Sequence, residues 1–249
     1  MINQAVDLSS LDNGVALIKM QDRDNRNTFS SILKDGLVRA FQHIYGSDEY
    51  KVVILTGYDS YFCCGGTQEE LRSFANGDGD FMDMDLQSLL LDCPIPVISA
   101  MQGHGIGGGL VMGLFADFVV LSRESIYTAN FMKYGFTPGM GATLILPHKF
   151  GKNIANEMMF TAKNYRGGEL EKRGVTLPIV ARNEVLNYSI ELGQSLAEKP
   201  RISLVTLKDH MTEILRESIS LYTEKEIRMH KKTFHLPETK ARIEMLFGH

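Results

Sequence analysis

The sequence of 249 residues is poor in cysteine, has no excess of positive charge and has no long apolar run. Its three cysteines, Cys63, Cys64 and Cys93, are odd in number with two adjacent, which suits neither a disulfide framework nor a zinc site. We therefore expect reduced thiols in a cytoplasmic protein. A formal net charge of −4 argues against a nucleic-acid-binding protein. No apolar stretch approaches the roughly 20 residues that span a bilayer, and the N-terminus lacks the pattern of a secretory signal.

What the sequence does contain is the composition of an ordinary globular protein, with 44% apolar and 22% charged residues. Short runs rich in Val and Ile predict buried strands, and they are Val15–Met20, Val52–Thr56, Pro96–Ala100 and Phe118–Ser122. Ser30 is predicted to cap a helix over Ile32–Tyr45, and a second helical stretch runs from about Met82 to Leu91. Strands that alternate with helices predict an α/β core of βαβ units.

After about Gly151 the chain becomes mostly helical, with one extended piece near Pro178–Val180. The predicted helices are Asn153–Thr161, Gly168–Arg173, Asn183–Glu198, Arg201–Arg216, Leu221–His230 and Pro237–Phe247. We expect residues 1–195 to form the α/β core and residues 196–249 to form a helical C-terminal region that covers the site and makes subunit contacts.

Two glycine-rich segments, residues 62–68 and 103–109, each follow a predicted strand and are candidates for a binding site. Glycine allows close backbone approach, and the N–H groups of such loops can point at developing negative charge. A tight turn that binds nothing would need the same residues, but two clusters at successive strand ends favour binding. His104, within the second cluster, is expected to pack or hydrogen-bond locally.

The second cluster also fits a dinucleotide-binding motif. Gly103, Gly105 and Gly108 match G-x-G-x-x-G after a strand, and Glu124 lies about 20 residues further on, where an acid would bind a ribose. However, the apolar helix that follows is short, and the motif lies in the middle of the chain. A nucleotide-dependent dehydrogenase is therefore the weaker alternative.

Five segments in order resemble the crotonase superfamily of enoyl-CoA hydratases and isomerases. They are residues 22–29, 52–57, 96–109, 116–118 and 135–142, and the similarity covers nearly the whole chain. The resemblance implies an α/β crotonase fold, a spiral of ββα units with two nearly perpendicular sheets and a helical C-terminal region. It also implies a homotrimer or a dimer of trimers, and an enzyme that needs no cofactor.

The resemblance places an oxyanion hole at the backbone N–H groups of Gly66 and Gly108. Two loops at neighbouring strand ends can direct two donors at one thioester oxygen, and one such donor typically lowers a barrier by about 2.7–4 kcal/mol. Gly65 and Thr67, beside the first donor, are expected to contact substrate. Arg23 and Arg26 lie where the family contacts the nucleotide end of CoA. Either they bind the phosphate of a phosphopantetheine arm or they belong to a solvated loop.

Hydratases of the family use two glutamates to activate water, and here Val111 and Phe131 occupy those positions. Neither side chain can transfer a proton, so ordinary hydration is not expected. Both are predicted to line an apolar substrate pocket. Loss of CO₂ from an activated carboxylate suits such a pocket, because two N–H donors in a dry site stabilise the enolate that forms.

Residues 65–69, 127–141 and 227–230 resemble the decarboxylating crotonases of polyketide β-branching, in particular the bacillaene type. This implies conversion of a 3-methylglutaconyl thioester on an acyl carrier protein to a 3-methylcrotonyl thioester. His230 would hold the carboxylate and then donate a proton. These enzymes often carry a lysine after the first glycine loop, but residues 73–81 contain Asp78 and Asp80 and no lysine.

An acyl carrier protein is expected to be acidic, so Arg201, Lys231 and Lys232 are candidate docking cations. Lys133 and Tyr134 are expected to be surface or packing residues. Two further alternatives stay open, a hydratase or double-bond isomerase of the same superfamily and a non-catalytic scaffold that binds an acyl carrier.

Overall fold

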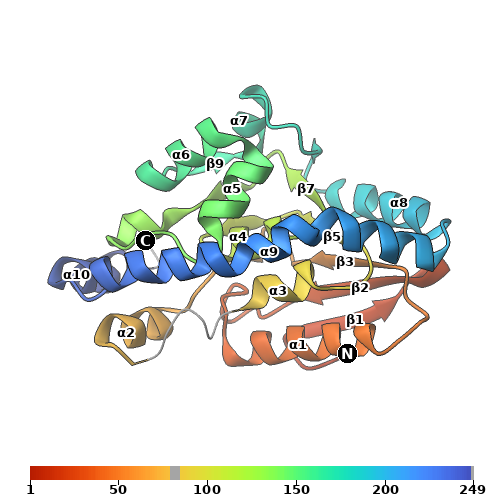
Figure 1. Cartoon of the computed structure of the whole chain (residues 1–249), viewed down its shortest axis with the longest axis horizontal. Coiled ribbons are helices and arrows are strands. Elements are labelled where there is room, and N and C mark those ends of the chain that lie inside the picture. Colours follow the sequence, from red (N-terminus) through yellow and green to blue (C-terminus); the bar gives the residue numbers. More distant parts are fainter. Residues whose placement is uncertain (79–84, 248–249) are drawn as a thin grey trace.

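The computed structural model describes residues 1–78 and 85–247 (Figure 1). Within them, six strands form one sheet in the order β1 (Val6–Ser10), β2 (Val15–Met20), β3 (Val52–Thr56), β5 (Val97–Met101), β7 (Phe118–Ser122) and β10 (Ile179–Val180). Only β1 runs antiparallel to its neighbour in this sheet. A smaller sheet has the order β4 (Tyr61–Cys63), β6 (His104–Ile106), β8 (Ile126–Thr128) and β9 (Tyr165–Arg166). Each of β3, β5 and β7 is thus followed by a strand of the smaller sheet.

Helices cover both faces of the larger sheet. Successive residues of β3 belong to two different hydrophobic clusters, Val53 and Leu55 to one and Val52 and Ile54 to the other. Side chains alternate across a strand, so the two clusters lie on opposite faces. Helix α8 packs on the face of Ile54, where α8 contacts β3, β5 and β7. The helices of the described segments are α1 (Ser31–Tyr45), α2 (Gln68–Asn76), α3 (Leu86–Leu91), α4 (Gly108–Leu114), α5 (Ala142–Phe150), α6 (Lys152–Thr161), α7 (Gly167–Lys172), α8 (Val185–Ala197), α9 (Arg201–Thr233) and α10 (Pro237–Leu246).

The strands and the first helix form where the pattern predicted them. Three of the four strands have the predicted bounds, and the run at Pro96–Ala100 is shifted by one residue. Ser30 caps α1 by accepting a hydrogen bond from the Leu33 N–H at 3.2 Å. The extended piece near Pro178–Val180 forms β10. For the helix predicted over Met82–Leu91, only α3 can be described, because residues 82–84 lie outside the described segments.

The prediction of separate helices at Arg201–Arg216 and Leu221–His230 is wrong. One continuous helix, α9, spans Arg201–Thr233, and Figure 1 shows it running the length of the molecule from α8 to α10. Residues 217–220 interrupt the apolar pattern but contain neither Gly nor Pro, so nothing ends the helix there. The domain boundary predicted at residues 195 and 196 lies near the C-terminal end of α8 and stays a prediction.

A buried ion pair anchors α9 to the larger sheet. The Nζ of Lys208 lies 2.8 Å from the Asp117 carboxylate and also donates to the carbonyls of Leu90 and Ile95. Asp117 in turn accepts a hydrogen bond from the Val97 N–H at 2.7 Å, at the start of β5. The acid of the Ala116-Asp117-Phe118 motif is therefore a structural residue. In the described residues, no helix combines the length and apolarity that crossing a membrane requires.

Candidate active site

The first glycine loop lies directly against the second. Gly65 has a φ of +76°, which favours glycine, and a β-carbon there would lie 3.1 Å from the amide nitrogen of Gly108. The loop is held from the other side by the Phe29 N–H, which donates to the Gly65 carbonyl at 2.7 Å. Together these contacts place the amide that follows, Gly66, beside the start of α4.

The second glycine loop turns from β6 into α4 within a few residues. Gly107 has a φ of +54° and precedes α4, and Gly108 is the first residue of that helix. A β-carbon on Gly109 would lie 2.2 Å from the Cys63 carbonyl oxygen, so only glycine permits this approach. Within the described residues, neither the Gly66 nor the Gly108 N–H has a protein acceptor. Two neighbouring donors are therefore available to a ligand.

A cavity of about 830 Å³ opens beside these two donors. Of the predicted site residues, Arg26, Gly65, Gly66, Thr67, Gly108 and Phe131 line it. Its apolar part is formed by Leu71, Phe136, Met140 and Phe247. Lys133 and Tyr134, which were expected to be surface or packing residues, also line it, and Tyr134 is buried. Within the described residues, no group of three or more His, Cys, Asp or Glu side chains could hold a metal ion.

The two positions where hydratases carry glutamates are apolar and shielded. Phe131 is 5% exposed and lines the cavity, whereas Val111 is fully buried within α4 and does not reach it. Asp24 is the only carboxylate among the described lining residues. The Glu70 carboxylate lies near Gly66, but it pairs with Lys34 at 2.5 Å and accepts a hydrogen bond from the Thr67 N–H.

Arg23 and Thr67 are engaged by neighbouring groups. Arg23 pairs with Asp59 at 2.7 Å, lies over the Tyr58 ring and does not line the cavity. The Thr67 hydroxyl caps α2, where it accepts a hydrogen bond from the Glu70 N–H at 3.1 Å. Of the two arginines predicted to bind phosphate, only Arg26 therefore lines this cavity.

His230 lies in a second cavity rather than in the first. This cavity of about 250 Å³ is lined by His230 and Glu226 of α9 and by Met140, which also lines the larger cavity. The His230 Nε2 lies 2.8 Å from the Thr137 carbonyl oxygen, and the ring is 6% exposed. Met140 thus stands between the paired amides and the histidine.

Glu226, a second residue of α9, binds the loop of residues 137–143, which His230 also contacts. The buried Glu226 carboxylate accepts hydrogen bonds from the Gly141 N–H at 2.7 Å and from the Thr143 N–H at 2.8 Å. The Thr143 hydroxyl donates to it as well, at 2.6 Å. Burial raises the pKa of Glu226, and these three donors act against that increase. With His230, this carboxylate holds residues 137–143 against α9 at both ends.

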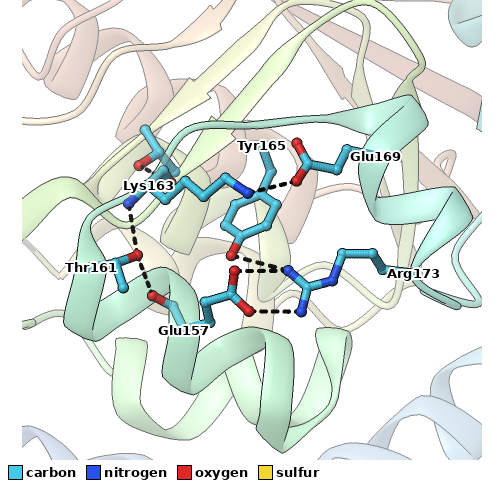
Figure 2. Close-up of polar contacts among 7 residues, drawn as sticks. Glu157, Thr161, Lys163, Tyr165, Glu169 and Arg173 are labelled. Carbon is cyan, nitrogen blue, oxygen red and sulfur yellow. Dashed lines mark hydrogen bonds and ion pairs between the residues drawn. The ribbon is translucent and has the colours of Figure 1, made fainter.

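One wall of the larger cavity is the loop of residues 162–164, beside a polar cluster (Figure 2). Arg173 makes two hydrogen bonds to Glu157, at 3.0 and 2.7 Å, and one to the Tyr165 hydroxyl at 3.3 Å. The hydrogen bonds from Arg173 lower the pKa of Glu157 to about 2. Lys163 pairs with Glu169 at 2.7 Å. The cluster ties α6, β9 and α7 together around this wall.

Two other titratable residues of the cavity have pKa values that are shifted toward their neutral forms. Burial raises the pKa of Cys64 to about 11, so its thiol stays protonated and is a poor nucleophile at neutral pH. Burial, with Arg182 and Arg166 nearby, lowers the pKa of His104. The His104 Nδ1 accepts a hydrogen bond from the Ile126 N–H at 3.0 Å, which confirms the expected local contact.

The features of a dinucleotide site are not brought together. The helix after the glycine motif, α4, is only seven residues long. Glu124 accepts hydrogen bonds from Ser122 and from the Arg182 N–H, and it does not line the cavity. Two acids, Asp78 and Asp80, lie in the segment where a lysine was expected. Asp80 lies outside the described residues. The backbone N–H of Asp78 donates a hydrogen bond to the Ser73 carbonyl oxygen at the C-terminal end of α2.

Residues 10–246 match the enoyl-CoA hydratase/isomerase family. The chain belongs to this family. It is 57% identical to the bacillaene synthase decarboxylase PksI of Bacillus subtilis over 248 residues, which cover all of both chains. A solved structure described as part of a dehydratase/decarboxylase enzyme couple of polyketide beta-branching has a TM-score of 0.97 and 57% identity, covering 99% of this chain and 100% of its own. The ECH2 decarboxylase domain of CurF from Lyngbya majuscula has a TM-score of 0.95 and 47% identity, covering 98% and 100%.

These similarities confirm the crotonase fold and the predicted enzyme class, a decarboxylase of the crotonase superfamily. Two residues of the site were given no role by the sequence. Met140 carried a signal, since a bulky residue between two glycines in Gly139-Met140-Gly141 indicates a special backbone position. Glu226 carried none beyond its position four residues before His230, which places both on one face of a helix.

Proposed function

We propose that this enzyme removes CO₂ from a 3-methylglutaconyl thioester carried on the phosphopantetheine arm of an acyl carrier protein. The product is a 3-methylcrotonyl thioester, which leaves a methyl branch on a polyketide. The observation that carries this proposal is the pair of N–H groups at Gly66 and Gly108, which have no acceptor within the described residues and lie beside a cavity with an apolar part. Its similarity to decarboxylases of bacillaene synthesis and polyketide beta-branching supports the choice of substrate.

The reaction has two steps. The bond between the carboxylate carbon and the acyl chain breaks, CO₂ leaves, and its bonding electrons delocalise onto the thioester oxygen as a dienolate. Gly66 and Gly108 donate hydrogen bonds to that oxygen. Phe131, Phe136 and Met140 exclude water, which strengthens both donors and destabilises the carboxylate relative to CO₂. A proton is then added to carbon, and no cofactor takes part.

His230 is the proposed proton donor and carboxylate partner. Its hydrogen bond with the Thr137 carbonyl oxygen fixes the orientation of the ring. Because a carbonyl oxygen can only accept, Nε2 carries the proton in this hydrogen bond. The ring lies just behind Gly139, where a β-carbon would be 2.4 Å from its Cε1 atom. The histidine therefore stands next to the loop that carries Met140 into the larger cavity.

The acyl carrier protein is the proposed partner, in the cytoplasm. Arg26 lines the larger cavity, which supports the proposal that it binds the phosphate of the arm. Lys231 and Lys232 are exposed near the C-terminal end of α9, on the same stretch as His230. Arg201 lies at the other end of α9, about 45 Å from Lys231 along the helix, and pairs with Asp48. The docking proposal therefore rests on the two lysines.

The proposed assembly is a homotrimer. Along α9, exposed apolar side chains recur at helical spacing, at Leu207, Met211, Ile214 and Leu221. Such a stripe on one helix is typical of a surface covered by another helix. A second copy of this chain is its proposed occupant, as the family resemblance implies.

Mass spectrometry tests the reaction directly. Purified enzyme is incubated with 3-methylglutaconyl-loaded acyl carrier protein, and the intact loaded carrier is weighed. Loss of the mass of CO₂ is expected. A gain of the mass of water would identify a hydratase instead, and an unchanged mass would favour an isomerase or a binding protein. If turnover at limiting carrier concentration did not weaken with added salt, docking through Lys231 and Lys232 would be contradicted.

A further inference from the structure

Met140 occupies a backbone conformation that a large side chain rarely adopts. Its φ is +63°, in the left-handed region, and it is one of six such non-glycine residues in the described segments. A bulky residue there costs free energy that glycine would not. Its side chain is nevertheless only 3% exposed. A non-glycine residue persists in such a conformation only where the surrounding structure holds it, so the packing of this buried side chain offsets the strain.

The two neighbours of Met140 could not carry a side chain. A β-carbon on Gly139 would meet the His230 ring, and one on Gly141 would lie 2.4 Å from the Ile219 Cδ1 atom. Gly141 itself has a φ of +80°. The loop backbone therefore lies directly on α9 at both positions, and Met140 is the one residue of the three whose side chain has space on the cavity side.

Met140 projects toward Gly108, the second of the two donors at the site that have no acceptor within the described residues. A β-carbon on Gly108 would lie 2.7 Å from the Met140 Sδ atom, so the thioether packs against the oxyanion-hole residue. Met140 also lines both the larger cavity and the cavity of His230. Among the described lining residues it is the only one shared by the two cavities.

We propose that Met140 is the specificity-determining residue for the branch at C3 of the acyl chain. This inference rests on the proposed function, in which the thioester carbonyl lies at Gly66 and Gly108. The carbons next to that carbonyl then contact the Met140 thioether, whose volume sets the space for the C3 substituent. A methyl group fits beside it, and a larger group collides. The flexible unbranched side chain moulds to the acyl chain, as methionine does in irregular gaps.

The test compares pantetheine thioesters of glutaconate, 3-methylglutaconate and 3-ethylglutaconate. In Met140→Ala, the kcat/KM ratio of the ethyl over the methyl substrate is expected to rise by at least about tenfold, the effect of one methylene group in an apolar pocket. Met140→Leu keeps the volume and should keep the ratio near that of the wild type. Both variants retain a β-carbon, so the backbone strain is the same and only the side-chain volume differs.

Met132→Ala is the matched control, because Met132 precedes the same loop and lines neither cavity. Its ratio should equal that of the wild type. An unchanged ratio in a folded Met140→Ala protein would overturn the proposal. If the wild type decarboxylates none of the three thioesters, the proposed function fails. The role of Met140 can then be tested without turnover, by calorimetric affinities for 3-methylcrotonyl and 3-ethylcrotonyl pantetheine. An affinity ratio in Met140→Ala equal to that of the wild type would reject the role of Met140.

Discussion

At the scale of single residues, His230 is the group whose chemistry the proposed reaction needs most. His230→Ala should lower kcat by roughly 10²–10³-fold, because a positioned acid–base group contributes on that order. Carbonyl stabilisation by Gly66 and Gly108 would remain, so residual decarboxylation is expected. Steady-state CO₂ release from the loaded carrier protein measures the loss.

His210→Ala provides the control for that measurement. His210 lies on the same helix but is exposed and lines neither cavity. Its variant should release CO₂ at the rate of the wild type. Full activity in His230→Ala would remove His230 from the mechanism and leave the proton donor to be sought among the titratable residues that line the larger cavity.

His104 predicts a pH dependence of stability. Its pKa is lowered in the folded protein by burial, so the unfolded chain binds the proton more readily. Stability from the neutral ring is fully present above the unfolded pKa of about 6.5 and is lost as pH falls through that value toward the lower folded pKa. His104→Asn keeps an acceptor for the Ile126 N–H and does not titrate. Urea unfolding from pH 5 to 8 should show the wild type losing stability against this variant as pH falls, and parallel curves would contradict the prediction.

The sequence indicated the two glycine loops more directly than the side chains around them. Two glycine clusters at strand ends marked the loops, and the family resemblance chose Gly66 and Gly108 within them. Arg23 was expected at the phosphate, but nothing local showed that Asp59 would pair with it. Likewise, no pattern showed that Val111 would be buried within α4 while Phe131 reached the cavity. These outcomes depend on tertiary contacts.

At the scale of elements, Glu226 links α9 to the N-terminus of α5. Glu226→Gln should lower the free energy of unfolding by about 1–3 kcal/mol, because an amide NH₂ would face backbone N–H donors and leave one unsatisfied. It should also lower kcat, since the loop with Met140 loses an anchor. Chemical denaturation and turnover measure the two effects.

Glu224→Gln is the matched control for that variant. Glu224 lies on the same helix two residues earlier, is exposed, and pairs with Arg228 four residues on, at 2.9 Å. Exposed pairs of this kind contribute about 0.3–0.5 kcal/mol, so the control should unfold almost as the wild type does. Equal stability of the two variants would show that the Glu226 hydrogen bonds do not hold the loop.

Elements were predictable where the apolar period was uniform. Helix α1 and strand β3 have clean patterns and were found with nearly correct bounds. Helix α2 was missed although Thr67 and Glu70 form a capping box, because the glycines before it suggested a loop. The smaller sheet follows from no local pattern, since its strands have only two or three residues each. Only the family resemblance implied it.

At the scale of the whole molecule, α9 connects the larger sheet with the loop of residues 137–143 at the site. Lys208 binds it to the larger sheet, and Glu226 and His230 bind it to the site loop. A helix of this length is about 50 Å long. Three residues of its apolar stripe, Met211, Ile214 and Leu221, lie between these anchors and are exposed in the single chain. An oligomer that covered the stripe would therefore also stiffen the helix that presents His230.

This link makes the oligomeric state testable together with activity. Light scattering on the wild type should give three times the chain mass of 27.9 kDa. Ile214→Glu places a charge in the stripe, where burial against another copy would cost several kcal/mol, and should shift the protein toward monomer. Thr206→Glu adds the same charge at an exposed position outside the stripe and should leave the trimer intact. If the proposed assembly holds α9 in place, Ile214→Glu should lose activity in proportion to the monomer fraction, and full activity in the monomer would show that α9 needs no second chain to position His230.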